Sequence, residues 1–496
     1  MTAAPPAADN PAAIESLYRH AFFADPFGQA AKRAPALEAR RSALAKRVAA
    51  LSDAPPPADA RSEGRAFYRS VARWMRDAAR PFLASVNKAP TEKTVVFVAS
   101  WLTGKIQRQA LALREKGWRC YLVVQAHDGV TAEILNRGFR GAFDGVFAAP
   151  RTFFAIFALV RQLRPTAFHV HCATWSQALG RVVDEGKRRA ACVCEVEDIF
   201  TVYAAPAVMA EVWPATAVAL EWAMERYICT RVDGFVHQFA PAVAEELAER
   251  HGPLTPTAIL PNYPFLRFTH IAAERSSRRD GVQRLVWAGN VWRADGSSAA
   301  DLVPSAGLPA ALESFLEQGF GCEIHVDPAK SFAPDARAWA PYRALERFPR
   351  FLFAQQGVPA EELSRRISHC DFGLLLMRLD LTRLRVRPEK LRLQVANKLF
   401  AYFEAGLPVL VNAEFAYMAD LVTRHGVGLA VASDDIDRLA ILLADFNHDQ
   451  AVENIRRFNH DHAMEHRIGR LLALYRREAA AGHNQEDCVC CATPRM

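Results

Sequence analysis

The sequence has 496 residues, of which 51% are hydrophobic, 23% charged and 10% aromatic. This length suggests about three domain-sized units, and the composition excludes a disordered or fibrous chain. The 61 lysines and arginines exceed the 54 aspartates and glutamates by only seven charges, without the concentrated basic footprint of a nucleic-acid-binding protein, so no nucleic-acid partner is expected.

The N-terminus predicts a cytoplasmic protein. Residues 1–13 contain neither the basic nor the apolar segment of a signal peptide. The longest apolar run, residues 153–160, is far shorter than the ~20 residues that span a bilayer. The protein is therefore expected in the cytoplasm, with a peripheral position at the inner membrane face as a second possibility.

Residues 1–92 are interpreted as a leader rich in alanine and proline that carries an amphipathic helix. The pattern predicts this helix over residues 63–79, ended by Pro81. Its basic face consists of Arg65, Arg69, Arg73, Arg76 and Arg80. Two interpretations stay open: the apolar face packs on the main body and the arginines are solvated, or the helix docks on an anionic membrane surface.

From Thr94 onward, short apolar strands alternate with amphipathic helices, which indicates parallel sheets covered on both faces. One series over residues 93–272 and another over 280–455 predict an α/β protein with two doubly wound, Rossmann-like domains. Ligands of such sheets bind outside the carboxyl ends of the strands, so the domains are expected to face each other across a cleft. Residues 456–480 predict a helix that crosses back, and residues 481–496 a disordered tail.

An anion site is predicted in the second domain at the segment 395–412. Asn397 is a predicted N-cap, Lys398 lies in the first turn, and Gly406 ends the helix before an apolar strand. The free N–H groups of a helix start, together with Lys398, favour a diphosphate. The alternative is an ordinary helix with a solvated first-turn lysine.

Three arginines precede this helix at alternate positions: Arg383, Arg385 and Arg387. Alternate residues of an extended segment share one face, so the three guanidinium groups would point together into the cleft and bind phosphate without a metal. In a helical segment they would diverge and only solvate the surface. Both interpretations stay open.

The first domain offers candidates for the acceptor side. His169 and His171 share one face at the end of an apolar strand, and Glu197 and Asp198 follow the next strand. We expect His169 to be a buried structural histidine, and His171 and Asp198 to act on an acceptor, because ligands collect at strand ends. A structural histidine and a capping carboxylate are the alternatives.

No metal site is expected. The ten cysteines lack a framework spacing and are expected as thiols, although the tail sequence CVCC at 488–491 leaves metal binding or oxidation open. The acidic segment 433–437 precedes an apolar helical run and favours capping. The histidines 460, 462 and 466 lack an accompanying set of catalytic ligands.

The order of these segments resembles that of GT-B glycosyltransferases of the family 4 type. In the second domain the likeness rests on the segments RLVWAGN (284–290), FLFAQQGVPAEELSRRISHCDFGLLL (351–376), NKLFAYFEAGLPVLV (397–411) and GVGLAV (426–431). In the first domain it rests on the segments RPTAFHVHCATW (164–175), ERYICTRVDGFVHQFAPAVAEEL (225–247) and ILPNYPF (259–265).

The resemblance implies a hexosyltransferase that binds a nucleotide sugar in the second domain and retains the anomeric configuration. The acceptor, held by the first domain, would be a cell-envelope saccharide or a lipid-linked saccharide, as in polysaccharide biosynthesis. Gly289 and Asn290 would lie in the first loop of the donor domain, and Lys398 and Glu404 on the donor helix. No cofactor and no metal are expected.

The chain departs from the family pattern on the donor helix. The family commonly has a glutamate five residues before the glycine that ends this helix, and here that residue is Ala401. Glu404 is the nearest carboxylate, with a solvated last-turn residue as its other interpretation. The loop after the first donor-domain strand offers only Arg293. Two alternatives stay open: a nucleotide-sugar epimerase or hydrolase on the same fold, and a catalytically degenerate GT-B protein that acts as a binding or scaffold protein.

Overall fold

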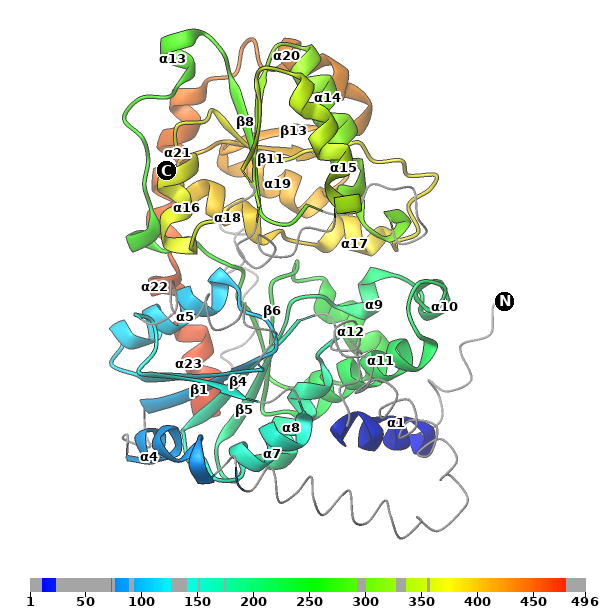
Figure 1. Ribbon diagram of the computed structural model, residues 1–496, viewed down its shortest axis with the longest axis vertical. Coiled ribbons are helices and arrows are strands. Elements are labelled where there is room, and N and C mark those ends of the chain that lie inside the picture. Colours follow the sequence, from blue (N-terminus) through cyan, green and yellow to red (C-terminus); the bar gives the residue numbers. More distant parts are fainter. Residues whose placement is uncertain are drawn as a thin grey trace.

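Two parallel sheets organise the protein (Figure 1). The computed structural model describes residues 11–23, 73, 76–88, 93–125, 141–149, 152–173, 175–291, 300–326, 336–354 and 357–478. Within these ranges, a seven-stranded sheet has the order β3-β2-β1-β4-β5-β6-β7 and a six-stranded sheet the order β10-β9-β8-β11-β12-β13. In each sheet the chain first adds strands on one side of the first strand and then on its other side, as in doubly wound sheets. The predicted fold class, two doubly wound α/β domains, is confirmed.

The first sheet is covered by helices on both faces. Its central strands β1, β4 and β5 are buried along their whole length, because they are mostly apolar and have a helix layer on either side. The strands are β1 (Thr94–Ala99), β2 (Arg119–Gln125), β3 (Gly145–Ala149), β4 (Ala167–Cys172), β5 (Ala191–Val196), β6 (Gly234–His237) and β7 (Thr257–Ile259). The main helices are α5 (Gly104–Glu115), α7 (Phe153–Val160), α8 (Ala178–Gly186), α9 (Phe200–Tyr203), α10 (Pro206–Ala210), α11 (Ala215–Arg231) and α12 (Val243–His251).

The second sheet repeats the plan on a smaller scale. Its strands are β8 (Arg284–Ala288), β9 (Gly321–His325), β10 (Phe351–Ala354), β11 (Phe372–Leu375), β12 (Val409–Asn412) and β13 (Gly428–Val431). Its helices are α13 (Ser277–Asp280), α14 (Leu308–Glu317), α15 (Ala336–Arg343), α16 (Ala360–Ile367), α17 (Pro388–Leu393), α18 (Asn397–Glu404), α19 (Ala416–His425) and α20 (Leu439–Leu442).

The C-terminal helices return to the first domain. The structure divides the predicted crossover into α21 (His448–Asp461), α22 (Met464–Arg467) and α23 (Gly469–Arg476). The chain bends between α21 and α22 because Ala463 adopts an extended backbone conformation. Figure 1 shows α22 at the junction of the domains and α23 against the first sheet, where Arg470 Nη1 donates to the carbonyl oxygen of Ile259 over 3.0 Å.

The N-terminal leader contains two helices whose bounds the structure gives in full. Helix α1 covers Pro11–Phe23 and α4 covers Arg80–Lys88. Residues 73, 76 and 77 are helical and a turn and a bend follow at 78 and 79, so helical conformation stops shortly before Pro81. Pro81 itself lies in the first turn of α4, where its missing N–H has no partner to lose. Most of the predicted helix at 63–79 lies outside the described residues, as do Arg293 and the CVCC segment.

Two further features bear on the sequence-based expectations. The cysteines in the described ranges are buried free thiols. Of the helices in those ranges, none has the length and apolar character needed to cross a membrane.

Candidate functional site

The loops that follow the carboxyl ends of the two sheets meet at the domain junction. After β11, the backbone N–H of Arg387 donates to the carbonyl oxygen of Tyr203, which lies after β5, over 2.8 Å. The backbone N–H of Ala240, after β6, donates to the carbonyl oxygen of Leu393 over 2.9 Å. The candidate site therefore lies where a doubly wound sheet binds ligands.

The structure brings Lys398 and Gly289 together. Gly289 follows β8 and has a φ of +123°, a left-handed conformation that favours glycine. A Cβ atom at this position would lie 2.8 Å from Cε of Lys398. The lysine side chain thus passes directly over the first loop of the sheet, with Nζ 4.3 Å from the ring centroid of Trp287. Asn290, the next predicted residue, is exposed beside this loop.

The start of α18 differs from its prediction in one detail. The N-cap is Ala396, and Asn397 is the first helical residue. Alanine has no side-chain acceptor, so the N-cap residue supplies no side-chain hydrogen bond to the start of α18. An uncapped helix start beside a lysine favours an anion.

The three alternate arginines do not converge on one point. A turn at 381–383, held by hydrogen bonds from the backbone N–H groups of Thr382 and Arg383 to Asp380, breaks the extended pattern on which that expectation depended. Each guanidinium group has its own protein partner. The partners are Asp301 for Arg383 (3.1 Å), Glu211 for Arg385 (2.6 and 2.7 Å) and the carbonyl oxygen of Thr201 for Arg387 (2.8 Å).

These arginines and α17 join the second domain to the first. Glu211 and Thr201 belong to the first domain, and Lys390 Nζ lies 3.3 Å from Asp198 Oδ1 and 4.5 Å from the ring centroid of Tyr203. Asp198 lies at the domain junction, as the prediction requires, and its carboxylate is paired with a lysine of the opposite domain.

His171 lies fully buried near the end of β4. Its Nε2 is 3.3 Å from Oε1 of Glu197. Burial lowers the pKa of His171, but the carboxylates of Glu197 and Glu195 outweigh this effect, and the pKa is raised above its ordinary value. His171 therefore cannot touch a solvent-borne ligand directly in this structure, whereas Glu197 is partly exposed.

His169 is a structural residue, which confirms the expectation for it. Its Nε2 bonds Glu195 Oε2 at 3.0 Å and its Nδ1 bonds the hydroxyl of Tyr475 at 2.8 Å. Both ring nitrogens are thus engaged inside the protein.

A buried ion pair joins Lys105 and Glu195, two residues that were not among the predicted site residues. Lys105, in the first turn of α5, is paired with Glu195, and Gln109 Nε2 donates to the same carboxylate over 2.8 Å. Burial raises the pKa of Glu195, but Lys105 and His169 outweigh it, so the pKa lies below its ordinary value. The available signal was a glutamate inside the apolar strand ACVCEV, because a buried carboxylate requires a partner.

Both interpretations of Glu404 are wrong. Its side chain is buried, at 2% exposure, and pairs with Arg108 of α5 through both carboxylate oxygens. The backbone N–H of Phe265 also donates to Oε1 over 2.8 Å. Glu404 does not face solvent, and its carboxylate is engaged inside the protein, because the last turn of α18 is covered by α5 and by the interdomain segment, residues 260–276 between β7 and α13.

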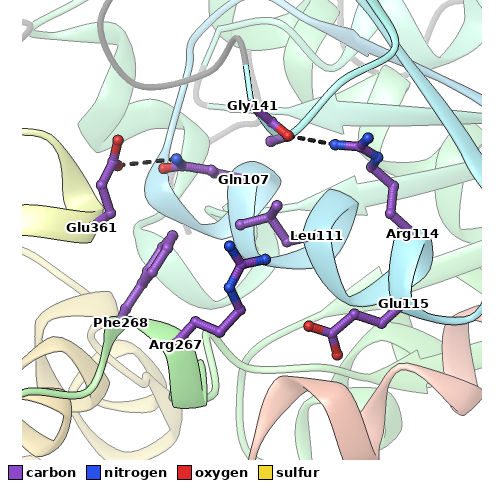
Figure 2. Close-up of a pocket in the computed structure, with 9 residues that line it drawn as sticks. Gln107, Leu111, Arg114, Glu115, Gly141, Arg267, Phe268 and Glu361 are labelled. Carbon is purple, nitrogen blue, oxygen red and sulfur yellow. Dashed lines mark hydrogen bonds between the residues drawn. The ribbon is translucent and has the colours of Figure 1, made fainter.

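A cavity of about 620 Å³ lies at the domain junction on the outer side of α5. Figure 2 shows Gln107 Nε2 donating to Glu361 of α16, with Arg267 and Phe268 beside them. The lining combines two arginines and two glutamates with apolar side chains: Gln107, Leu111, Arg114, Glu115, Gly141, Ala142, Arg267, Phe268 and Glu361. The predicted site residues are absent from this lining, so the cavity is distinct from the Lys398 region.

Comparisons with known proteins bear on the second domain. Residues 336–464 match the family model described as "Glucosyltransferase 3-like, C-terminal domain". No curated protein matches the chain. The second domain thus contains a glucosyltransferase-like segment that includes α17 and α18.

Several solved structures are similar to the chain at low identity. A glycosyltransferase involved in avilamycin A biosynthesis has 13% identity, covering 78% of this chain and 97% of that chain, with a TM-score of 0.44. A UDP-N-acetylglucosamine 2-epimerase from Rickettsia bellii has 10% identity, covering 77% and 96%, with a TM-score of 0.45. The calicheamicin glycosyltransferase has 11% identity, covering 78% and 99%, with a TM-score of 0.40.

Proposed function

We propose that this chain is a retaining hexosyltransferase that moves a sugar from a nucleotide-sugar donor to a cell-envelope saccharide or a lipid-linked acceptor. The observation that carries the proposal is the position of α18. It lies inside the glucosyltransferase-like segment, and its first turn places Lys398 over the loop after β8.

The donor half of the reaction needs a group that neutralises a departing diphosphate. An uncapped helix start and a lysine supply fixed positive charge where negative charge develops. Gly289 has no side chain and a φ of +123° that other residues rarely adopt, so a diphosphate could approach the backbone here, beside the Lys398 side chain. This arrangement needs no metal for the leaving group.

The acceptor half is assigned to the loops after β4 and β5. Glu197 is partly exposed and is the group that would contact an acceptor hydroxyl, while buried His171 would hold and tune its carboxylate. We therefore expect His171→Ala to lower kcat while the Kd of the donor stays nearly unchanged. Steady-state kinetics and donor calorimetry measure the two quantities separately, and parallel losses of donor binding and folding would make His171 structural.

A thermal-shift panel of nucleotides and nucleotide sugars tests the donor assignment. A ligand at about 100 times its Kd stabilises the folded state by about 2.7 kcal/mol, so a bound donor raises the Tm of the full chain. A shift by one nucleotide series, lost in Lys398→Ala, supports the proposal. A panel without any shift contradicts it.

Product analysis then tests the reaction type. Transfer requires that sugar appears on an added acceptor and that nucleoside diphosphate is released only in its presence, with the anomeric configuration read from the product by NMR. Consumption of the donor without an acceptor would indicate an epimerase or a hydrolase.

One observation favours a second candidate, a degenerate GT-B protein that binds without transfer. Ala401 offers no carboxylate, and Glu404 is engaged by Arg108. Donor binding without turnover of any acceptor would support this candidate.

A peripheral membrane position remains part of the proposal for a lipid-linked acceptor. Of the five arginines proposed to dock on an anionic surface, Arg73, Arg76 and Arg80 are exposed, and Arg65 and Arg69 lie outside the described residues. Liposome co-sedimentation at low and high salt tests the membrane position. It compares the unmodified chain with one variant that carries four substitutions: Arg65→Gln, Arg69→Gln, Arg73→Gln and Arg76→Gln. Liposome binding that is unaffected by salt and by the four substitutions contradicts the membrane position.

A further inference from the structure

Three side chains of the types that ligate metals lie together in the second domain. Glu323 lies on β9, and His369 and Cys370 lie between α16 and β11. One donor atom from each residue lies within 4.8 Å of the other two. Nε2 of His369 is 2.9 Å from Oε1 of Glu323 and 3.7 Å from Sγ of Cys370.

These separations suit a tetrahedral ion. With zinc–nitrogen bonds of about 2.0 Å and zinc–sulfur bonds of about 2.3 Å, the nitrogen–sulfur edge of a tetrahedron is about 3.5 Å. The burial of the three ligand side chains would let an ion enter and be retained. Cys370 and Glu323 are buried, whereas the His369 side chain is 39% exposed. An ion can therefore enter past the imidazole and be held by buried ligands.

Neighbouring groups hold two of the three ligands in place. Nε2 of His325 lies 3.0 Å from Oε2 of Glu323, the carboxylate oxygen that faces away from His369. His369 also hydrogen-bonds the backbone of Arg366 in α16. Hydrogen bonds of this kind orient metal ligands in proteins.

We propose that Glu323, His369 and Cys370 bind a divalent transition-metal ion of the zinc type, with water in the fourth position. Thiolate and imidazole donors select such ions over magnesium or calcium. Binding displaces the thiol proton of Cys370 and the proton that His369 shares with Glu323, and both pass to solvent. This proposal departs from the expectation, made from the sequence, that the protein binds no metal.

The position of the cluster assigns it a structural role. The backbone N–H of Asp371, next to Cys370, donates to the carbonyl oxygen of Arg284 at the start of β8. Gly289 and Lys398 lie beyond the other end of that strand. The ion would therefore tie β9 to the segment before β11 and take no part at the proposed donor site.

Cobalt titration of the full chain tests the proposal. Because the thiolates of the tail cysteines are further ligands that cobalt could use, the protein carries Cys488→Ser, Cys490→Ser and Cys491→Ser. The protein is stripped with chelator and titrated with Co²⁺ alone. One equivalent should bind and produce a near-ultraviolet thiolate-to-cobalt absorption band, and bound metal is counted by mass spectrometry after gel filtration.

Matched variants in the same background locate the ion. Cys370→Ser should abolish the band, and His369→Ala, at a half-exposed position, should weaken Co²⁺ binding by at least about tenfold. Cys322→Ser is the control, because Cys322 is equally buried on β9 but points to the opposite face of the sheet. A background protein that binds no cobalt, or a band that persists in both Cys370→Ser and His369→Ala, overturns the proposal.

Discussion

Lys398 lies where a helix start and a strand end meet, and its charge is the strongest candidate for a phosphate contact. A charge-assisted hydrogen bond contributes about 1.5–3 kcal/mol, so Lys398→Ala should weaken nucleoside diphosphate binding by about 10- to 150-fold without loss of fold. Isothermal titration calorimetry measures the affinity. Arg392→Ala, which removes an equal charge from an exposed position on α17, should leave it unchanged. Equal affinities of wild type and Lys398→Ala would remove the lysine from the site.

Glu221 on α11 gives the protein a pH-dependent stability. Burial raises the pKa of this carboxyl to about 8, above its ordinary value of 4.5. The folded state therefore holds a proton that the unfolded state releases. The contribution of this group to the free energy of unfolding is fully present below about pH 4.5 and is lost as the pH rises through 8. The free energy of unfolding should fall by about 1 kcal/mol per pH unit between about pH 6 and 8 from this group alone.

Chemical denaturation of Glu221→Gln at several pH values checks this expectation. The neutral amide cannot titrate, so its curve should be flatter than that of wild type over this pH range. Glu249→Gln, at an exposed position of α12, should keep the wild-type slope. Identical slopes for wild type and Glu221→Gln would contradict the assignment.

At single residues, sequence reasoning succeeded where a local pattern decided the outcome. The position of His169 inside an apolar strand, further from the strand end than His171, predicted a buried residue, and the first-turn position of Lys398 followed from the helix pattern. It failed for Asn397 and Glu404. The N-cap depends on the backbone angles of Ala396, and the partner of Glu404 is Arg108, almost 300 positions away in the chain.

At the scale of elements, α5 and α18 are joined by the buried pair of Arg108 and Glu404. Removing one partner of a buried ion pair leaves an uncompensated charge and typically costs about 3–5 kcal/mol. Arg108→Met should therefore lower the free energy of unfolding by about this amount in urea. The double variant with Glu404→Leu should recover part of the loss, since both charges are then absent.

The exposed pair of Arg456 and Glu453 provides the control for this comparison. Arg456→Met should change stability little, because solvent screens exposed charges. If Arg108→Met behaved like Arg456→Met, the buried pair would contribute nothing to the junction between α5 and α18.

Whole elements were more predictable than their ends. Apolar runs between helices identified the strands β1–β5 and β8–β12, because a parallel strand buried on both faces is mainly apolar. The segment 383–387 was ambiguous, since its sequence fits both an extended segment, in which the three arginines share one face, and a helix, in which they diverge. Its conformation is decided by the turn at Asp380 and by partners in the other domain, which no local pattern encodes.

At the scale of the whole molecule, the path of the chain couples the two domains. The backbone N–H of Met464, at the start of α22, donates to the carbonyl oxygen of Pro264 in the interdomain segment. Helix α23 then packs on β5, β6 and β7, where Leu474 Cβ lies against Gly234. The sequence predicted that a last helix crosses back. It could not predict the surface on which the helix packs, because that surface forms only when β5, β6 and β7 lie side by side in the first sheet.

This crossing predicts where a defect in α23 is felt. Leu474 is buried at 2% exposure, and Leu474→Ala should cost about 2–5 kcal/mol. Because its neighbours belong to the first sheet, hydrogen-exchange protection should fall more in β5 and β6 than in β12 and β13. Arg476→Ala, on the exposed face of the same helix, should leave both sheets protected. A loss of protection confined to the second sheet would mean that α23 stabilises the domain it leaves, and not the domain on which it packs.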